Sequence, residues 1–181
     1  MRGRFGNRLK SWKTKRRNKK LCEQYPFLIP WNRWSGYLIT ECTGGKKKGY
    51  WPGRPDEFPT YNYSYTELDN MPIGWRKAFG LQMCQELKDE LVKCDDLDRW
   101  RIVDLKEKYG YMRLYDNGYK SISKIGDIIA KYEGLSARTC IICGKPATKI
   151  TTGWISPFCD DCCPNERAVS IEEYYDMEVY E

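Results

Sequence analysis

Four cysteines near the C-terminus constrain the fold of this chain more than any other feature of its sequence. They form two C-x2-C pairs separated by fifteen residues, Cys140 with Cys143 and Cys159 with Cys162. This spacing is typical of a four-cysteine zinc site. Zinc prefers four ligands at tetrahedral angles, and two intervening residues let both thiolates of a pair turn toward one ion. The sequence therefore predicts that zinc is bound by Cys140, Cys143, Cys159 and Cys162.

The sequence around these pairs predicts a zinc ribbon over residues 138–164. Gly144 follows the first pair, where a tight turn needs a positive φ or a close backbone approach. Between the pairs, residues 147–151 and 154–158 are expected to form two short strands joined at residues 152–153. Structural zinc sites chiefly supply folding energy, so this motif indicates how the segment is held together rather than a reaction.

Two alternatives stay open for these cysteines. The pairs can form disulfides, but the N-terminal sequence does not resemble a secretory leader, so we expect a reducing, cytoplasmic setting that favours zinc. Cys163 is a fifth thiol beside the second pair and can replace Cys162, although the C-x2-C register favours Cys162. The remaining cysteines are expected to be free thiols, often buried as small hydrophobic groups: Cys22, Cys42, Cys84 and Cys94.

The chain of 181 residues contains no histidine. This excludes Ser-His-Asp and Cys-His catalysis, acid–base catalysis by imidazole, and metal sites with imidazole ligands. No apolar run approaches the ~18 residues that a membrane-spanning helix requires. There is also no phosphate-binding loop or dinucleotide-binding fingerprint. We therefore expect neither a membrane partner nor a small-molecule substrate.

Charge is distributed unevenly along the chain. Residues 1–20 carry ten basic side chains and no acidic one, whereas residues 21–181 carry 21 basic and 25 acidic side chains. Residues 165–181 hold six acids against one arginine, and are expected to form an acidic tail. Because residues 1–20 have few apolar side chains to pack, they are expected to form a basic arm that is disordered or a frayed helix when isolated.

The basic arm is the candidate nucleic-acid interface. Its cations would neutralise phosphates and release counterions, and Trp12 and Phe5 could stack on bases. The arm could instead be a solvated tail, or could bind an acidic protein surface. The predicted nucleic-acid-binding residues are Arg2, Arg4, Arg8, Lys10, Lys13, Lys15, Arg16, Arg17, Lys19 and Lys20.

Residues 21–137 are expected to form a small body between the arm and the ribbon. Residues 25–34 are bracketed by prolines and predict an extended segment, with a strand at residues 37–41. Residues 43–60 are rich in Gly, Pro and Lys, which predicts a solvated loop. Three tyrosines then alternate with polar residues and are expected to share one face of an extended segment, which packs on a helix or stacks bases: Tyr61, Tyr63 and Tyr65.

Two amphipathic helices are predicted in this body. Asp69 or Asn70 can cap the first, and Pro72 lies in its first turn. The second covers residues 122–135 and leads into the ribbon. In the first helix apolar residues recur every four positions, so that one stripe faces the core: Trp75, Phe79, Met83, Leu87 and Leu91.

Between the helices, residues 101–108 and 111–115 are expected to pair as a hairpin around Tyr109 and Gly110. The order of elements predicts an α+β fold, a small mixed domain with two amphipathic helices and a hairpin, followed by a C-terminal four-cysteine zinc ribbon. Asp104 and Lys106 point to the same face of the first strand, as in some metal-dependent nucleases, and Asp98 or Glu107 could add a second carboxylate. Charged residues on a strand more commonly form its solvated face.

Several blocks of the sequence, read together, resemble an uncharacterised family of small zinc-ribbon proteins encoded by bacteriophages and prophages. The blocks are YPFLIPWNRW at 25–34, YNYSYTELDNMPIGWRKAFG at 61–80, LKEKYGYMRLYDNG at 105–118, and the ribbon at 140–162. The resemblance covers about residues 21–163, and its ribbon cysteines correspond to the two pairs above. It implies zinc as the metal and the cytoplasm of an infected bacterial cell as the setting, rather than a reaction.

Charge layout and resemblance together predict a phage-encoded, non-catalytic zinc-ribbon protein that associates with DNA or RNA through its basic arm. The alternative is a protein-binding effector that inhibits a host nucleic-acid-handling or anti-phage defence complex, as anti-CRISPR proteins do. A metal-dependent nuclease is the second alternative. Salt distinguishes the first two, because phosphate binding weakens steeply as salt rises, whereas an interface with an apolar core does not.

Overall fold

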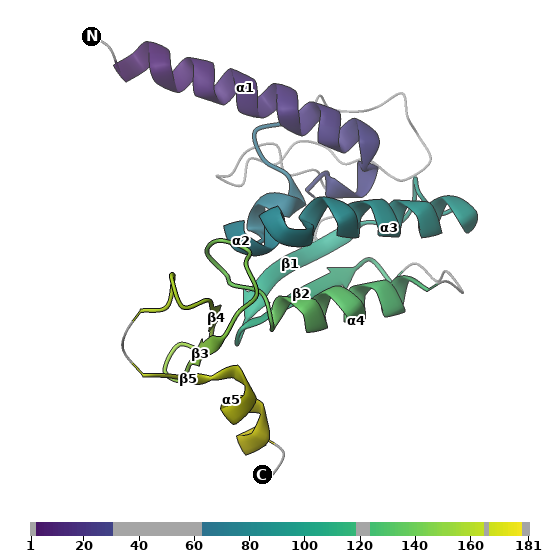
Figure 1. Cartoon of the computed structure of the whole chain (residues 1–181). Coiled ribbons are helices and arrows are strands. Elements are labelled where there is room, and N and C mark those ends of the chain that lie inside the picture. Colours follow the sequence, from purple (N-terminus) through teal and green to yellow (C-terminus); the bar gives the residue numbers. More distant parts are fainter. Residues whose placement is uncertain (1–2, 31–62, 119–123, 165–166, 179–181) are drawn as a thin grey trace. The chain divides into compact units, whose positions relative to one another are not determined.

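The computed structural model describes residues 3–30, 63–118, 124–164 and 167–178, with the side chains of residues 3–11 and 177–178 excepted (Figure 1). It contains helices, a two-stranded hairpin and a small three-stranded sheet, which confirms the predicted α+β fold. The chain divides into two compact units. Unit 1 comprises residues 1–69, 88–104 and 115–123, and unit 2 comprises residues 70–87, 105–114 and 124–181.

Unit 1 begins with helix α1, Gly3–Gln24, followed by the 3-10 turn η1, Pro26–Leu28. The basic arm, expected to be disordered or a frayed helix when isolated, is helical from Gly3 onward, and the helix runs four residues beyond residue 20. The reason lies at its C-terminal end, where the fully buried Asn18 donates from Nδ2 to the carbonyl of Tyr63 at 3.0 Å, and Cys22 is buried. These contacts stabilise a helix that its amino-acid composition alone would not stabilise.

Aromatic side chains form the core of unit 1. Phe27 and Trp100 are fully buried or nearly so, and their rings meet edge to face with centroids 5.3 Å apart. Trp100 Nε1 donates to the Asp116 carboxylate at 3.1 Å, which satisfies the polar end of the indole. The proline-bracketed segment, expected to be extended, instead forms the 3-10 turn η1 in its described part, and burial of Phe27 and Leu28 explains why it is apolar.

The predicted helix cap is wrong in detail. Asp69 and Asn70 lie in a separate 3-10 turn, η3, Glu67–Asn70, where Asp69 Oδ2 accepts from the amide of Thr66 at 2.9 Å. Pro72 is the N-cap residue of the next helix, rather than part of its first turn. Asp69 thus closes the preceding turn, and the helix begins without a side-chain cap.

The long helical segment consists of α2, Ile73–Trp75, the π-helical turn η4, Arg76–Gly80, and α3, Leu81–Lys93. The predicted apolar stripe is buried throughout. A stripe that recurs every four residues drifts around a regular α-helix, whose turn holds 3.6 residues. The wider π turn near its start reduces that drift. The sequence predicted the helix and its stripe, but not this turn.

The hairpin consists of β1, Ile102–Lys108, and β2, Tyr111–Asp116, close to the predicted strands. Tyr109 and Gly110 both have positive φ, 53° and 80°, as a two-residue type I′ turn requires. A Glu107 carboxylate oxygen accepts a hydrogen bond from the amide of Gly110 at 2.7 Å and steadies the turn.

Helix α4, Ile125–Ser136, covers the edge of β2 in unit 2. Ser136 Oγ accepts from the amide of Met112 at 2.8 Å, and Glu133 accepts from the amide of Leu114 at 3.2 Å. Arg113 pairs with the same glutamate at 3.0 Å. Polar side chains of the helix therefore accept hydrogen bonds from alternate amides of β2. These hydrogen bonds cover an edge of the two-stranded sheet that would otherwise be open.

The ribbon sheet has the order β4-β3-β5, with β3 at Lys149–Thr151, β4 at Pro157–Phe158 and β5 at Ala168–Ser170. Both pairings are antiparallel, and Ile150, fully buried, faces Pro157 on one side and Val169 on the other. The two expected strands exist but are shorter than predicted.

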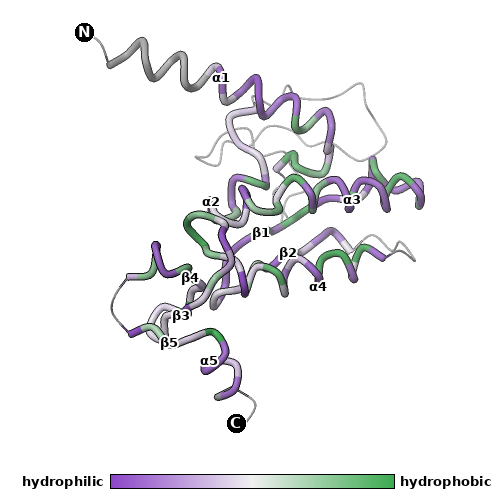
Figure 2. The backbone as a smooth tube through the Cα atoms, viewed as in Figure 1, coloured by the Kyte–Doolittle hydropathy of each residue, from purple (hydrophilic) through white to green (hydrophobic). Residues whose placement is uncertain are grey.

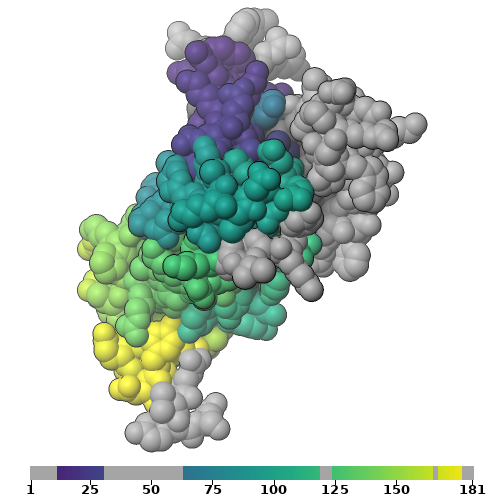
Figure 3. Space-filling model, turned by 90° about the vertical axis from the view of Figure 1, so that its right-hand side faces the viewer, coloured from purple at the N-terminus to yellow at the C-terminus, as the bar shows by residue number. Residues whose placement is uncertain are grey.

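The segment expected to be an acidic tail is instead structured in its described part. It contributes β5 and helix α5, Ile171–Glu178, which lies against the ribbon in the space-filling view (Figure 3, yellow). Ile171 is buried, and its amide donates to the carbonyl of Thr148 at 3.1 Å. The prediction of a tail relied on the acidic residues of this segment and overlooked the apolar side chains of Val169 and Ile171.

Several predictions lie outside the described residues: the strand at 37–41, the loop at 43–60, Tyr61 and Cys42. Tyr63 and Tyr65 are half-buried, and Tyr63 has a φ of 54°, so the expected regular alternation does not continue there. Within the described part of the chain, no helix is long and apolar enough to cross a membrane.

Candidate metal centre

The structure brings the four predicted cysteines together in unit 2. The Sγ atoms of Cys140, Cys143, Cys159 and Cys162 all lie within 4.8 Å of one another, and the four residues are free thiols rather than disulfides. Sulfur ligands about 2.3 Å from a tetrahedral ion are about 3.8 Å apart, so this spacing suits one ion. The cluster can therefore hold a metal.

Two similar backbone turns place the thiols. The amide of Gly144 donates to the carbonyl of Cys140 at 3.0 Å, and the amide of Cys163 donates to that of Cys159 at the same distance. Gly144 has a φ of 87°, which glycine adopts without strain. Although burial opposes it, hydrogen bonds from the backbone at Cys143 and Cys159 lower the pKa of the Cys140 thiol to about 6. The backbone around Cys140 thus favours its thiolate, the form that binds a metal, whereas hydrogen bonds to neighbouring thiols, Cys159 first, raise the pKa of Cys162 to about 12.

Cys162, not Cys163, completes the cluster. The Cys163 thiol contacts the carbonyl of its neighbour Pro164 at 3.4 Å, and among the described residues it belongs to no group of potential ligands. The C-x2-C register therefore identified the correct member of this adjacent pair.

Burial indicates a structural centre. Cys140 and Cys159 are buried, and Cys143 and Cys162 are half-buried. Four protein ligands complete a tetrahedral shell, whereas catalytic zinc sites keep one position open for water or substrate. A metal ion held by all four cysteines would therefore keep no position open for substrate.

The cluster is joined to the start of α2 by backbone contacts within unit 2. The amide of Gly74 donates to the carbonyl of Ile141 at 3.0 Å, and Trp75 Nε1 donates to that of Thr139 at 2.8 Å. A Cβ on Gly74 would lie 2.1 Å from the Cys140 carbonyl oxygen, and one on Gly144 would lie 2.6 Å from the Gly74 carbonyl oxygen. Two glycines thus permit the cysteine turn and the helix start to touch.

The predicted nucleic-acid-binding residues lie on α1, in unit 1. Of those whose side chains are described, all are exposed: Lys13, Lys15, Arg16, Arg17, Lys19 and Lys20. Arg17 lies 3.5 Å from Asp69, and Lys19 lies 3.8 Å from Glu23. Helix α1 also includes Arg4, Arg8 and Lys10, but their side chains, and all of Arg2, lie outside the described residues.

Within the described residues, Asp104 belongs to no group of three or more potential metal ligands. In the described ranges, the four cysteines form the one group of three or more potential metal ligands. Glu107, expected as a possible second carboxylate, is bonded to the hairpin turn. No carboxylate cluster within these ranges therefore supports the alternative of a metal-dependent nuclease.

Two other cysteines are structural. Burial raises the pKa of the Cys22 thiol to about 12, with the charges of Asp69 and Glu23 adding to the effect, and burial alone raises the pKa of the Cys84 thiol to about 12. Both thiols are protonated at neutral pH, and protonated thiols are poor nucleophiles. The expectation that they act as small hydrophobic groups is confirmed.

No protein-family model, curated protein or solved structure matches this chain. The phage-family resemblance therefore stays a prediction from the quoted sequence blocks.

Proposed function

We propose that the protein is a non-catalytic nucleic-acid-binding protein in which the cysteine cluster holds zinc and the basic surface of α1 binds phosphates. A set of four sulfur ligands favours zinc or iron–sulfur centres, and two short C-x2-C turns around one ion are the usual form of the zinc site. Zinc here stabilises unit 2 and takes no part in a reaction.

The observation that carries this proposal is the outward face of α1. Lys13, Arg16 and Lys20 are exposed and follow one another at spacings of three and four residues, which places them on one side of a helix. Asn18 and Cys22, which are buried, anchor the other side. We define Lys13, Arg16 and Lys20 as the outer basic face.

The shape of α1 suits a nucleic-acid backbone. At 1.5 Å per residue its 22 residues span about 33 Å. Its coloured part in Figure 2 is mostly hydrophilic, so little of it can enter an apolar core. Trp12 is 57% exposed and lies beside Arg16, whose guanidinium is 5.6 Å from the ring centroid. A row of cations with an adjacent ring offers phosphate contacts and a stacking surface together.

The test is the triple variant K13A/R16A/K20A, measured by fluorescence anisotropy with labelled DNA and RNA over a salt series. Removing one cation that binds a phosphate lowers the slope of log K against log salt by about 1, so we expect the slope to fall by about 2 to 3. The matched control, K77A/K93A/K124A, removes three exposed lysines elsewhere and should leave the slope near the wild-type value.

Equal slopes for the wild type and the outer-face variant would refute phosphate binding by α1. A host protein that the wild type captures equally well at high salt and after nuclease treatment would favour the alternative, an effector that inhibits a nucleic-acid-handling or defence complex. The phage origin would be tested by the genomic context of the sequence.

A further inference from the structure

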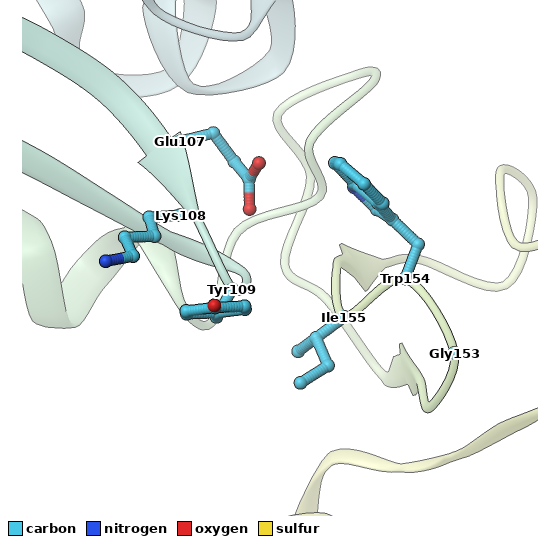
Figure 4. A pocket seen from close by; sticks show the side chains of 6 residues that line it. All are labelled: Glu107, Lys108, Tyr109, Gly153, Trp154 and Ile155. Atoms are coloured by element: carbon cyan, nitrogen blue, oxygen red, sulfur yellow. The ribbon is translucent and has the colours of Figure 1, made fainter.

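A hollow of about 360 Å³ lies in unit 2, between the tip of the β1–β2 hairpin and the β3–β4 turn of the ribbon. We call it the hairpin–ribbon hollow. The hairpin contributes one side and the ribbon the other (Figure 4). Its lining residues are Glu107, Lys108, Tyr109, Gly153, Trp154 and Ile155.

The two sides of this hollow are held by close contacts. A Cβ on Gly110 would lie 3.3 Å from Ile155 Cγ2 and 3.6 Å from Pro157 Cδ, so glycine lets the hairpin tip approach the ribbon closely. In the ribbon turn, Thr151 Oγ1 accepts from the amide of Ser156 at 3.1 Å and donates to the carbonyl of Trp154. The hollow is thus formed before any ligand binds.

Two aromatic rings line the hollow and are nevertheless largely in solvent. Trp154 is 80% exposed and Tyr109 is 68% exposed. Rings that serve only packing are normally covered, and a side chain as large as Trp gains most by burial. Tyr109 projects from the hairpin and Trp154 from the ribbon turn, so a ligand in the hollow would meet one ring from each element (Figure 4).

The polar groups in and beside the hollow indicate which polar groups a ligand should carry. One Glu107 carboxylate oxygen, Oε1, accepts from the amide of Gly110, and a carboxylate has a second oxygen able to accept. Lys108 Nζ lies 5.4 Å from the Tyr109 ring centroid, so a cation stands beside the same ring. Stacking faces, a hydrogen-bond acceptor and a nearby cation match a base, its amino group and its phosphate.

We propose that the hairpin–ribbon hollow binds an unpaired nucleobase of single-stranded nucleic acid, stacked on Trp154 and Tyr109, with Glu107 accepting from an exocyclic amine. This deepens the proposed function and rests on it. Cytosine, adenine and guanine carry such an amine, whereas thymine and uracil do not, so the site prefers the first three bases to the last two. A duplex keeps its bases stacked and cannot fill the site.

The cation beside Tyr109 favours this occupant over an arginine or lysine of a protein partner. Lys108 points away from the hollow in Figure 4, but its ammonium lies 5.4 Å from the Tyr109 ring centroid and would repel a basic side chain that approaches this ring. A phosphate following a stacked base would instead be attracted to that ammonium.

The experiment compares W154A and E107Q with the wild-type full chain, using labelled oligomers of deoxycytidine, of thymidine and of an abasic spacer. W154A should weaken deoxycytidine binding about tenfold with the salt slope unchanged, and should leave abasic binding unchanged. E107Q retains an oxygen for the Gly110 amide and should lose the preference for deoxycytidine over thymidine. Y115A, which removes a 48% exposed ring elsewhere, is the control.

Wild-type affinity of W154A for deoxycytidine oligomers would overturn the base site, as would an equal loss for the abasic spacer. If W154A lost binding to an arginine-containing peptide that the wild type binds, while its nucleic-acid binding stayed intact, the base site would also be overturned. The hollow would then be assigned to a protein partner. The outer-face variant of α1 separates the two proposals: if it loses salt-dependent binding while W154A does not differ from wild type, only the base site fails.

Discussion

Replacing Cys140 with serine should release the metal and unfold the ribbon. A structural zinc site contributes about 10–16 kcal/mol of apparent binding free energy in small zinc-dependent folds, which is comparable to the ~5–15 kcal/mol stability of a whole domain. Because α2 bonds to the backbone beside Cys140, the loss should extend to the start of the helical segment. Elemental analysis and thermal unfolding of the variant should show no bound metal and a loss of cooperative unfolding.

Cys163→Ser is the matched control, since it removes a thiol adjacent to the cluster but outside it. This variant should keep its metal and melt close to the wild type. A strong chelator added to the wild type should reproduce the Cys140→Ser result. If Cys140→Ser retained both full metal content and wild-type melting, the four cysteines would not form the metal site.

Gly74→Ala should destabilise the protein by about 3 kcal/mol or more, the upper part of the range for overpacking. The new methyl group would lie 2.1 Å from the Cys140 carbonyl oxygen and 2.6 Å from the Ile141 carbonyl carbon. Both are backbone atoms of the cysteine turn, so the clash is relieved only by moving the turn or the helix. Chemical denaturation gives the change in unfolding free energy, and a zinc-competition titration gives the accompanying loss of metal affinity.

Gly134→Ala provides the comparison for this substitution. Gly134 is also helical, but a Cβ there has nothing within 4 Å. Alanine at this position should stabilise the protein by up to about 1 kcal/mol through helix propensity. Similar effects of the two substitutions would show that Gly74 does not hold the helix against the cysteine turn.

The sequence predicted best those features that depend on local pattern. The C-x2-C spacing identified the four clustered cysteines, the four-residue stripe identified the buried face of α2–α3, and Tyr109–Gly110 located the hairpin turn. In each case the residue type is required by geometry within a few positions along the chain. Such requirements are readable without knowing what the segment packs against.

The features that could not be predicted from the sequence depend on contacts between segments that are distant along the chain. Ten cations at the N-terminus indicated a disordered arm or a frayed helix, but Asn18 donates a hydrogen bond to the backbone of Tyr63 and helps to anchor α1. Acidic residues after 165 indicated a tail, but Val169 pairs with Ile150 in the ribbon sheet. Composition averages over a segment, whereas one or two buried side chains decide whether it is ordered.

The candidate base site could not have been predicted either. Trp154 was expected as part of a strand, and its exposure beside Tyr109 becomes visible only when the hairpin tip and the ribbon turn are placed together. Two rings so far apart along the chain have no shared sequence signal. The nearest hint that the sequence offers is a tryptophan directly after the turn residues Thr152 and Gly153.

Native mass spectrometry of the purified wild-type chain counts the metal ions on the folded protein and so shows whether the four cysteines hold one. We expect one zinc ion per chain, bound with loss of the thiol protons, and its disappearance when the ribbon unfolds. A folded chain that carries no metal, and whose mass and stability do not change when zinc is added, would contradict this expectation.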